Sequence, residues 1–363
     1  MSGPEPHPAL RTRFCEAVGI RYPIVQTGMG WVGGARLASA TAQAGGLGVL
    51  ASSTMTLDQL AAAVGALKGA TDAPFGVNVR SDAADIFARL DLMAEAGVKV
   101  ASFPQAPTQK MVARCHEAEM FVLCTIGARR HAEKVLDLGV DGVIAQGGEG
   151  GGHTGPVPTT LLVPQVVDAV GAQMVVLSAG GIFDGRGLVS ALAYGADGVA
   201  MGTRFLLSAE STVPDVVKTR YLAATVLDTT VSAKIDGAPQ RVIKTDFVDA
   251  LERSHWLALL PRALKSAHAF RKETGLSLLD LAKEGWSMRK SAERNLTQLV
   301  LAANAPVMTK AALVEGRTDV GILPTGQVVG LIAELPTVDD ILSGMIGQAN
   351  EVLDRLGGGA GPA

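Results

Sequence analysis

The stretch VQTGMGWVGG, residues 25–34, places three glycines in the spacing G-x-G-x-x-G directly after a short apolar run. This spacing has two interpretations: the phosphate loop of a nicotinamide-binding Rossmann domain, or a glycine-rich loop of another α/β fold. A Rossmann domain requires an acidic residue about 20 residues further on, where it binds the ribose hydroxyls. The second apolar run ends as GVLASS at 48–53, and no carboxylate follows before Asp58. The missing acidic residue therefore argues against a Rossmann domain.

A repeat of strands and helices extends from this stretch to residue 205. Eight short apolar runs with helix-like segments between them lie at 23–26, 48–51, 75–79, 99–103, 121–125, 141–145, 174–178 and 198–201. A strand that returns roughly every 25 residues is typical of parallel strands joined by crossover helices. Eight such units favour a TIM (β/α)8 barrel over an open, doubly wound α/β sheet. We therefore predict an α/β barrel core over residues 10–205.

The pattern changes after residue 205, where helical periodicity replaces the strand–helix repeat. We expect residues 206–336 to form a mainly helical appendage over the barrel mouth, with room for a short hairpin in the polar interval 228–246. A long helix over 337–356 is expected to return to the barrel wall. The glycine-rich tail at 357–363 is expected to be disordered.

The composition and charge exclude several classes of function. The chain has 363 residues, of which 48% are hydrophobic and 18% charged, so it can bury a large core. A net charge of −3 with interleaved signs gives no electrostatic footprint for nucleic acid or an anionic membrane. Three cysteines without C-x-x-C spacing support neither a disulfide framework nor a metal site. The N-terminus lacks the apolar segment of a secretory signal, so we expect a cytoplasmic protein that binds a small molecule.

A phosphate site is expected at the end of the barrel repeat. Barrel enzymes bind ligands at the carboxyl ends of their strands, often with a phosphate in the loops after strands seven and eight. SAGGIFDGRG at 178–187 and AMGTRF at 200–205 occupy these two places, although one such loop alone could be an ordinary turn. We expect a phosphate cradle from Gly180, Gly181, Gly202 and Thr203. A cofactor held there, with its ring lying against the backbone of the first βα loop, suggests FMN.

One histidine differs from the others in its surroundings. His153 lies in QGGEGGGHTGPVPTT, residues 146–160, directly after the sixth expected strand. An imidazole, with an unperturbed pKa of about 6.5, suits a base near neutral pH. Glu149 either orients this loop or is solvated, while Asn78 and Gln146 either bind a ring edge or satisfy backbone groups. The histidines that we expect to be structural or exposed are His7, His116, His131, His255 and His268.

As an ordered set, VQTGMGW, FGVNVR, QGGEGGGHTG, SAGGIFDGRG and GADGVAMGTRF resemble the motifs of the FMN-dependent nitronate monooxygenase family, over residues 14–345. The family signature Q-G-x-E-A-G-G-H is matched at 146–153, with Gly150 in place of alanine. The resemblance implies that His153 is the catalytic residue and that FMN places its phosphate in the expected cradle. It also implies cofactor contacts from Gln26, Thr27, Gly28, Met29, Gly30, Asn78, Gln146, Gly151 and Gln327.

Within the family, residues 25–60 and 211–222 look most like the actinobacterial flavoproteins of steroid C/D-ring degradation, which act on an indanone propionyl-CoA intermediate. This resemblance implies dehydrogenation of a CoA thioester, with proton abstraction by His153 and electron transfer to flavin N5. Oxidation of alkyl nitronates with O2 and reduction of an enoyl thioester stay open as alternatives, as does a homodimer. Basic residues that either meet CoA phosphates or form a solvated face are Lys218, Arg220, Arg241, Lys244 and Arg262.

Overall fold

A closed barrel of eight parallel strands forms the body of the molecule. The computed structural model describes residues 3–254 and 304–358. The barrel strands, in the order in which they pair, are β1 Ile24–Gln26, β2 Leu47–Ala51, β3 Phe75–Asn78, β4 Val100–Phe103, β5 Phe121–Ile126, β6 Gly142–Gln146, β8 Val175–Ala179 and β9 Gly198–Met201. Pairing of Ile24 with Val199 joins the first strand to the last and closes the barrel. The predicted TIM barrel is confirmed, and each strand lies within one residue of its expected position.

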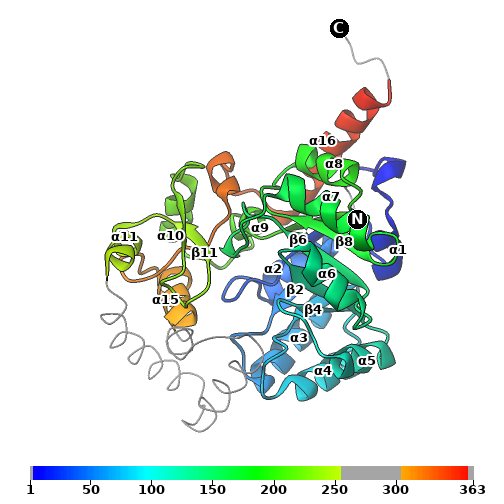
Figure 1. Ribbon diagram of the computed structural model, residues 1–363, viewed down its shortest axis with the longest axis horizontal. Helices are drawn as coiled ribbons and strands as arrows, with labels where there is room; N and C mark the ends of the chain where they lie inside the picture. The colour runs from blue at the N-terminus through cyan, green and yellow to red at the C-terminus, as the bar shows by residue number, and fades with distance from the viewer. Residues whose placement is uncertain (1–2, 255–303, 359–363) are drawn as a thin grey trace.

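Helices surround the barrel on its outer face (Figure 1). They are α2 Ala35–Gln43, α3 Leu57–Ala70, α4 Ile86–Glu95, α5 Gln109–Glu117, α6 Arg129–Leu136, α7 Thr159–Val170 and α8 Gly185–Ala193. A 3-10 turn, η1, at Pro8–Leu10 and helix α1 Arg13–Val18 precede the first strand, and the buried side chains of α1 pack with residues inside the barrel. Alternation along each strand separates two cores. On β8, Val175 and Leu177 belong to the cluster inside the barrel, whereas Val176 packs in the cluster between strands and helices.

The last helix, α16 Val338–Leu356, packs against α8 and α2. Thr337 begins this helix with a capping box, in which its side chain accepts from the Asp340 N–H. The side chain of Gln348 in turn accepts a hydrogen bond of 2.8 Å from the N–H of Gly185, the first residue of α8. The C-terminal part of the chain therefore completes the wall of the barrel.

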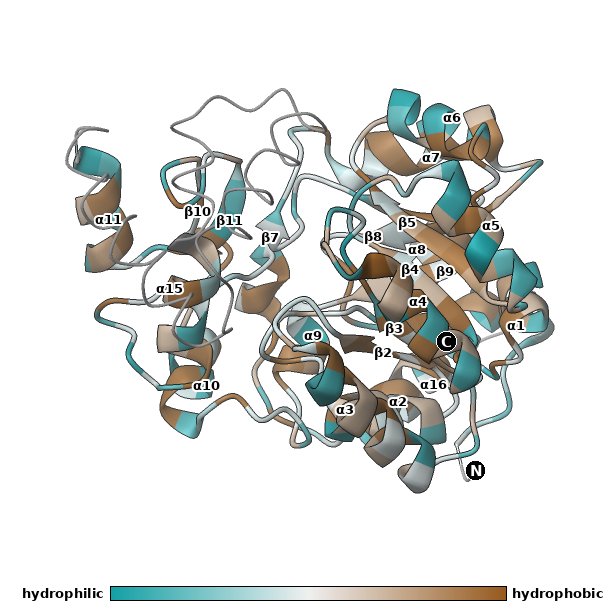
Figure 2. Ribbon diagram, turned by 90° about the horizontal axis from the view of Figure 1, so that it is seen from below, coloured by the Kyte–Doolittle hydropathy of each residue, from teal (hydrophilic) through white to brown (hydrophobic). Residues whose placement is uncertain are grey.

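A second group of elements lies beside the barrel mouth (Figure 2). It contains α9 Thr203–Leu206, α10 Asp215–Leu222, β10 Thr229–Ser232, β11 Gln240–Ile243, α11 Asp246–Arg253, α15 Asn304–Leu313 and the 3-10 turn η2 Gln327–Leu331. A separate small core, with Ile235, Val242 and Leu251 among its members, holds the hairpin to α11 and α15. The appendage is thus a folded unit with its own apolar centre.

The hairpin that the sequence allows at 228–246 forms from β10 and β11. A third strand, β7 Gly152–His153, joins it and was not predicted. The part of the expected appendage at 255–303 and the tail at 359–363 lie outside the described residues, so the division of the chain at 205 and 336 stays a prediction. Within the described ranges, no helix is long and apolar enough to cross a bilayer, and no group of three or more His, Cys, Asp or Glu could hold a metal.

Candidate active site

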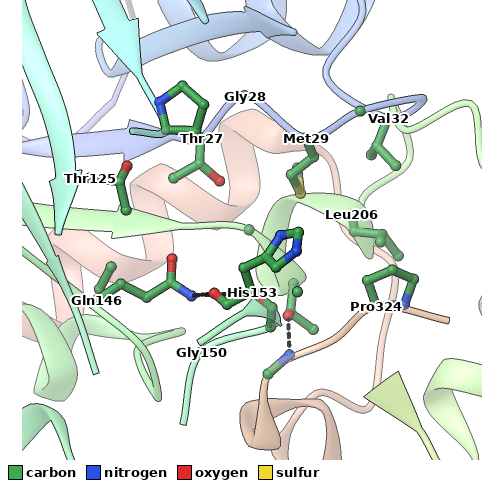
Figure 3. A pocket seen from close by; sticks show the side chains of 18 of the residues that line it. Thr27, Gly28, Met29, Val32, Thr125, Gln146, Gly150, His153, Leu206 and Pro324 are labelled. Atoms are coloured by element: carbon green, nitrogen blue, oxygen red, sulfur yellow. Dashed lines mark hydrogen bonds between the residues drawn. The ribbon is translucent and has the colours of Figure 1, made fainter. Parts of the chain in front are cut away.

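A cavity of about 650 Å³ lies where the barrel mouth meets the appendage. Its size is ordinary for a cofactor or small-molecule site. It is lined by barrel loops and by residues of α15 and of the segment before η2. Figure 3 shows Met29 and His153 from the barrel loops together with Pro324 from that segment. The expected site residues that line it are Thr27, Gly28, Met29, Gly30, Asn78, Gln146, Gly151, His153, Gly180, Gly181, Gly202 and Thr203. Residues up to 176 positions apart in the sequence are therefore brought together, from Thr27 to Thr203.

Two expected site residues, Gln26 and Gln327, are not among the residues that line the cavity. Gln26 is fully buried, and its side chain joins β1 to β2: Nε2 donates to the carbonyl of Val49 at 3.2 Å, while Oε1 accepts from the Val49 N–H at 3.3 Å. Gln327 is half-buried, and its backbone N–H donates to the carbonyl of Glu149 at 3.0 Å. The cofactor contacts expected of both glutamines stay predictions.

The expected phosphate cradle follows β8 and β9. Gly180 and Gly181 have φ angles of +103° and +73°, which side chains other than glycine rarely adopt. Within residues 3–254 and 304–358, neither of their backbone N–H groups donates to a protein acceptor. The hydroxyl of Thr203 accepts from the Gly326 N–H at 3.0 Å, which leaves its own proton available to a ligand. Two free backbone donors and a hydroxyl fit an anion such as a phosphate.

The opposite side of the cavity has the shape and polarity for a flat ring. A Cβ atom added at Gly28 would lie only 2.4 Å from the Cβ of Asn78, so the first loop rests directly on this side chain. Asn78 donates to the hydroxyl of Ser102 at 3.3 Å and thereby holds its amide in place. Apolar atoms of Met29 and Ala200 line the same cavity. Together with the cradle, these residues fit a cofactor that has both a phosphate and a planar ring.

His153 is fixed by strand pairing. In β7 it lies opposite Gln240 of β11, and the next residue, Thr154, donates its N–H to the carbonyl of Pro239 at 3.1 Å. Gln146 also holds this segment, because its Nε2 donates to the carbonyl of His153 at 2.7 Å (Figure 3). Hydrogen bonds from Gln146 and from the hairpin segment thus fix the part of the glycine-rich loop that carries the histidine.

The imidazole of His153 contacts a buried carboxylate. Its Nε2 lies 2.8 Å from Oδ2 of Asp236 and 3.2 Å from Nε2 of Gln240. The side chain of His153 is 59% exposed, whereas that of Asp236 is 6% exposed. Burial alone would raise the pKa of Asp236, but hydrogen bonds from His153, Gln240 and the Ala238 N–H outweigh it and lower the pKa. The site therefore pairs an accessible imidazole with an ionised carboxylate.

Glu149 orients the glycine-rich loop. Its Oε2 accepts from the backbone N–H of Thr159 at 2.9 Å and from the hydroxyl of Thr159 at 2.8 Å, at the start of α7. Arg241 fixes the neighbouring turn, since its Nη2 donates to the carbonyl of Gly148 at 2.9 Å. Of the two interpretations that the sequence left open for Glu149, the structure supports the orienting one.

The basic residues considered for CoA binding have different surroundings. Arg241 is engaged with the loop, and buried Lys218 donates from Nζ to the carbonyls of Ser208 and Ser211 at 2.9 and 2.8 Å. Both side chains therefore donate hydrogen bonds to backbone carbonyls and are not part of a solvated face. Arg220 and Lys244 are exposed, and Arg262 lies outside the described residues.

The three other histidines in the described part of the chain lie outside the cavity lining. His7 accepts from the Ala9 N–H, His116 pairs with Asp141 at 3.0 Å, and His131 is exposed on α6. None of these three lines the cavity. His255 and His268 lie outside the described residues.

Two site features were missed from the sequence. Asp236 stands in a hairpin turn, where an acidic residue is ordinary. Trp31, within the opening glycine stretch, has φ +66° and donates from Nε1 to the carbonyl of Pro306 at 3.2 Å, which links the first barrel loop to α15. One face of α15 then completes the cavity wall with Ala305, Pro306, Thr309 and Leu313.

This chain is similar to a known protein family and to two named proteins over most of its length. A family model described as nitronate monooxygenase matches residues 11–89 and 83–347. A protein of Rhodococcus jostii RHA1, named (3aS,4S,5R,7aS)-5-hydroxy-7a-methyl-1-oxo-octahydro-1H-indene-4-carboxyl-CoA dehydrogenase, is 53% identical over 96% of this chain and 98% of its own length. A Mycobacterium tuberculosis protein of the same name is 52% identical over 93% and 95%.

Solved structures agree with the fold. FabK from Thermotoga maritima superposes with a TM-score of 0.77 at 31% identity, over 96% of this chain and 99% of that one. A nitroalkane oxidase from Streptomyces ansochromogenes gives a TM-score of 0.72 at 26% identity, over 93% and 99%. The similarity to both structures spans barrel and appendage together.

Proposed function

This chain belongs to the nitronate monooxygenase family, a family of flavoproteins, and from that premise we propose that it is an FMN-dependent dehydrogenase of a bicyclic hydroxyacyl-CoA thioester. The observation that carries the proposal is identity above 50% over nearly the full length of two relatives named as such dehydrogenases. Their names give a carboxyl-CoA, where the sequence motifs alone suggested a propionyl-CoA. For this chain we therefore propose a substrate with the carboxyl-CoA group that the relatives' names give.

The relatives' names also define the reacting group. They place a hydroxyl on ring carbon 5, next to carbon 4, which carries the CoA thioester. Such a substrate is a β-hydroxy thioester, and its dehydrogenation removes a hydride from carbon 5 and a proton from the hydroxyl. The apolar wall formed by Trp31, Leu206 and Leu313 supports the proposal, because it suits a fused alicyclic ring.

We assign the cofactor to the residues that fit it. Gly180, Gly181 and Thr203 would hold the phosphate of FMN with backbone and hydroxyl donors, and Asn78 with Gln146 would border the ring. When bound, the flavin supplies the electron acceptor for the hydride. The protein supplies position and proton control.

His153 is proposed as the base. Its imidazole lines the cavity and is more than half exposed, so a substrate hydroxyl can reach it. Removal of the hydroxyl proton makes the oxygen a better electron donor as the hydride leaves. Met29 and Ala200 add apolar atoms to the cavity lining.

An anaerobic spectrum tests this proposal. The flavin-loaded protein is mixed without oxygen with a bicyclic β-hydroxyacyl-CoA, a straight-chain β-hydroxyacyl-CoA and an alkyl nitronate in separate experiments. We expect the bicyclic thioester to bleach the flavin absorbance fastest. Bleaching by the nitronate alone, with oxygen uptake in air, would instead identify a nitronate monooxygenase, and protein purified without any flavin would contradict both activities.

A further inference from the structure

We propose that Asp236, assisted by Gln240, is a positioning residue that fixes the tautomer and orientation of His153. The inference rests on the proposed function in one respect, that His153 is the base. It adds that hairpin β10–β11 of the appendage, and not the barrel, determines which nitrogen of the imidazole is free to accept a proton. Three features of the structure support it.

The first feature is the direction of the hydrogen bond. An ionised carboxylate can only accept, so the 2.8 Å contact between Oδ2 of Asp236 and Nε2 of His153 assigns the proton of the neutral imidazole to Nε2. The amide nitrogen of Gln240, 3.2 Å from the same Nε2, is also only a donor, so with this tautomer its proton goes to the carboxylate of Asp236 and not to the imidazole. Nδ1 is then the nitrogen with a free lone pair. Without the carboxylate, both tautomers of a neutral imidazole are accessible, and only one leaves the accepting atom at Nδ1.

The second feature is that the carboxylate is itself held. Oδ1 of Asp236 accepts from the Ala238 N–H at 3.1 Å, and the Gln240 amide also donates to the carboxylate. The side chain is 6% exposed, so a partner that did not match its charge would leave a costly buried anion. These bonds keep Asp236 in one orientation before substrate arrives.

The third feature is backbone pairing. His153 and Gln240 are opposite one another in the β7–β11 register, so the imidazole and the amide project from the same point of the sheet. Gln240 also closes the loop that begins after Ser232 of β10 and contains Asp236. The register thus places the histidine and the carboxylate at a fixed separation although 83 positions lie between them.

Other charged groups near this pair are engaged elsewhere. Arg241, the next residue of β11, donates to the carbonyl of Gly148 and the hydroxyl of Thr229. Glu149 of the glycine-rich loop accepts from Thr159. Lys234 of the hairpin donates to the carbonyls of Glu252 and Ser254. Asp236 is therefore the charged group in direct contact with the imidazole in the described part of the chain, and it would stabilise the imidazolium formed when the base accepts a proton.

Nitrogen NMR of the histidine side chains tests the tautomer without any substrate. Wild-type flavin-loaded protein labelled with ¹⁵N-histidine is compared with Asp236→Asn, and His153→Ala identifies the resonances of His153. We expect neutral His153 in the wild type to have a protonated Nε2 and an unprotonated Nδ1. Asp236→Asn should give a mixture of tautomers. A wild-type proton on Nδ1, or an unchanged tautomer in Asp236→Asn, would overturn the proposal.

Kinetics provide the second test. In Asp236→Asn we expect flavin content and KM to stay within about threefold of wild type, while the anaerobic rate constant of flavin reduction falls about 10²- to 10⁴-fold. Its pH–rate profile is measured beside that of the wild type. Asp236→Glu should restore part of the rate, since it keeps the charge.

Asp228→Asn is the matched control, because Asp228 is an exposed appendage carboxylate that accepts from Thr225 and does not line the cavity. Equal rates and equal pH profiles for Asp236→Asn and Asp228→Asn would overturn the proposal. If Asp236→Asn does not fold, Gln240→Met replaces it, with a smaller rate loss expected in the same direction and an unchanged rate contradicting the role of the hairpin. Failure of the proposed function appears differently: the wild type would not be reduced by the thioester, while the tautomer could still be measured.

Discussion

The Cβ atom that an alanine would add at Gly28 would lie 2.4 Å from the Cβ of Asn78 and 2.9 Å from its Cγ. Asn78 cannot easily move away, because its amide donates to Ser102 and its carbonyl accepts from the hydroxyl of Ser52 at 2.7 Å. Because Gly28 has no side chain, the first barrel loop can pass directly against the Asn78 side chain.

We predict that Gly28→Ala loses most of its bound flavin while remaining folded. Overpacking at a contact of this kind costs about 1–3 kcal/mol, and here the displaced groups border the cavity. The measurement is the ratio of flavin to protein absorbance after purification, with circular dichroism for the fold. Gly34→Ala is the control, because its added Cβ has no atom within 4 Å. A normal flavin content in Gly28→Ala would show that Asn78 does not need its present position.

At the scale of elements, α8 and α16 meet through a second glycine. A Cβ atom at Gly185 would lie 2.4 Å from the carbonyl oxygen of Met345 and 2.5 Å from the backbone nitrogen of Ala349. Both neighbours are helix backbone, which cannot adjust as a side chain can. The close approach of these two helices therefore depends on this position.

We expect Gly185→Ala to lower the Tm by an amount equivalent to about 1–3 kcal/mol, because α16 must move away from α8. Gly344→Ala in the same helix pair should leave the Tm unchanged or raise it by the equivalent of about 0.5–1 kcal/mol, since its Cβ meets open space and alanine favours a helix interior. Thermal melts of both variants check this. A Gly185→Ala melt equal to that of Gly344→Ala would mean that the C-terminal helix does not stabilise the barrel.

The elements also differ in how well the sequence predicts them. The barrel strands are short, mainly apolar runs that return at regular intervals, and several of them follow a glycine turn, so local pattern is sufficient, as for DGVIA at 141–145. Strand β7 has no such pattern. Gly152 and His153 become a strand only because β11, far along the chain, pairs with them. A two-residue strand of this kind depends on a tertiary contact and could not be found from periodicity.

The same distinction applies to the candidate site of the whole molecule. Residues on the barrel loops could be placed at one rim because parallel strands of a barrel all end there, as Asn78, Gln146 and Gly180 do. Asp236 and the α15 face could not, since they enter from the appendage and no rule of the barrel locates them. The side chain of Gln26 bonds to the carbonyl of Val49 on β2, and the cofactor contact that the family resemblance implies for it stays a prediction.

Barrel and appendage therefore contribute different parts of one proposed chemistry. The barrel provides the cofactor cradle, and the appendage provides the carboxylate beside His153 together with the α15 wall of the cavity. Trp31 connects the two through its bond to Pro306. An oxidoreductase built in this way can keep its cofactor site while the appendage varies the substrate.

The most direct test is a crystal structure of the flavin-loaded protein at a resolution that places the cofactor. We predict FMN with its phosphate on the backbone of Gly180 and Gly181, its ring beside Asn78 and Gln146, and the imidazole of His153 facing the open side of that ring. A phosphate bound at another part of the rim, or a ring out of reach of His153, would contradict this prediction.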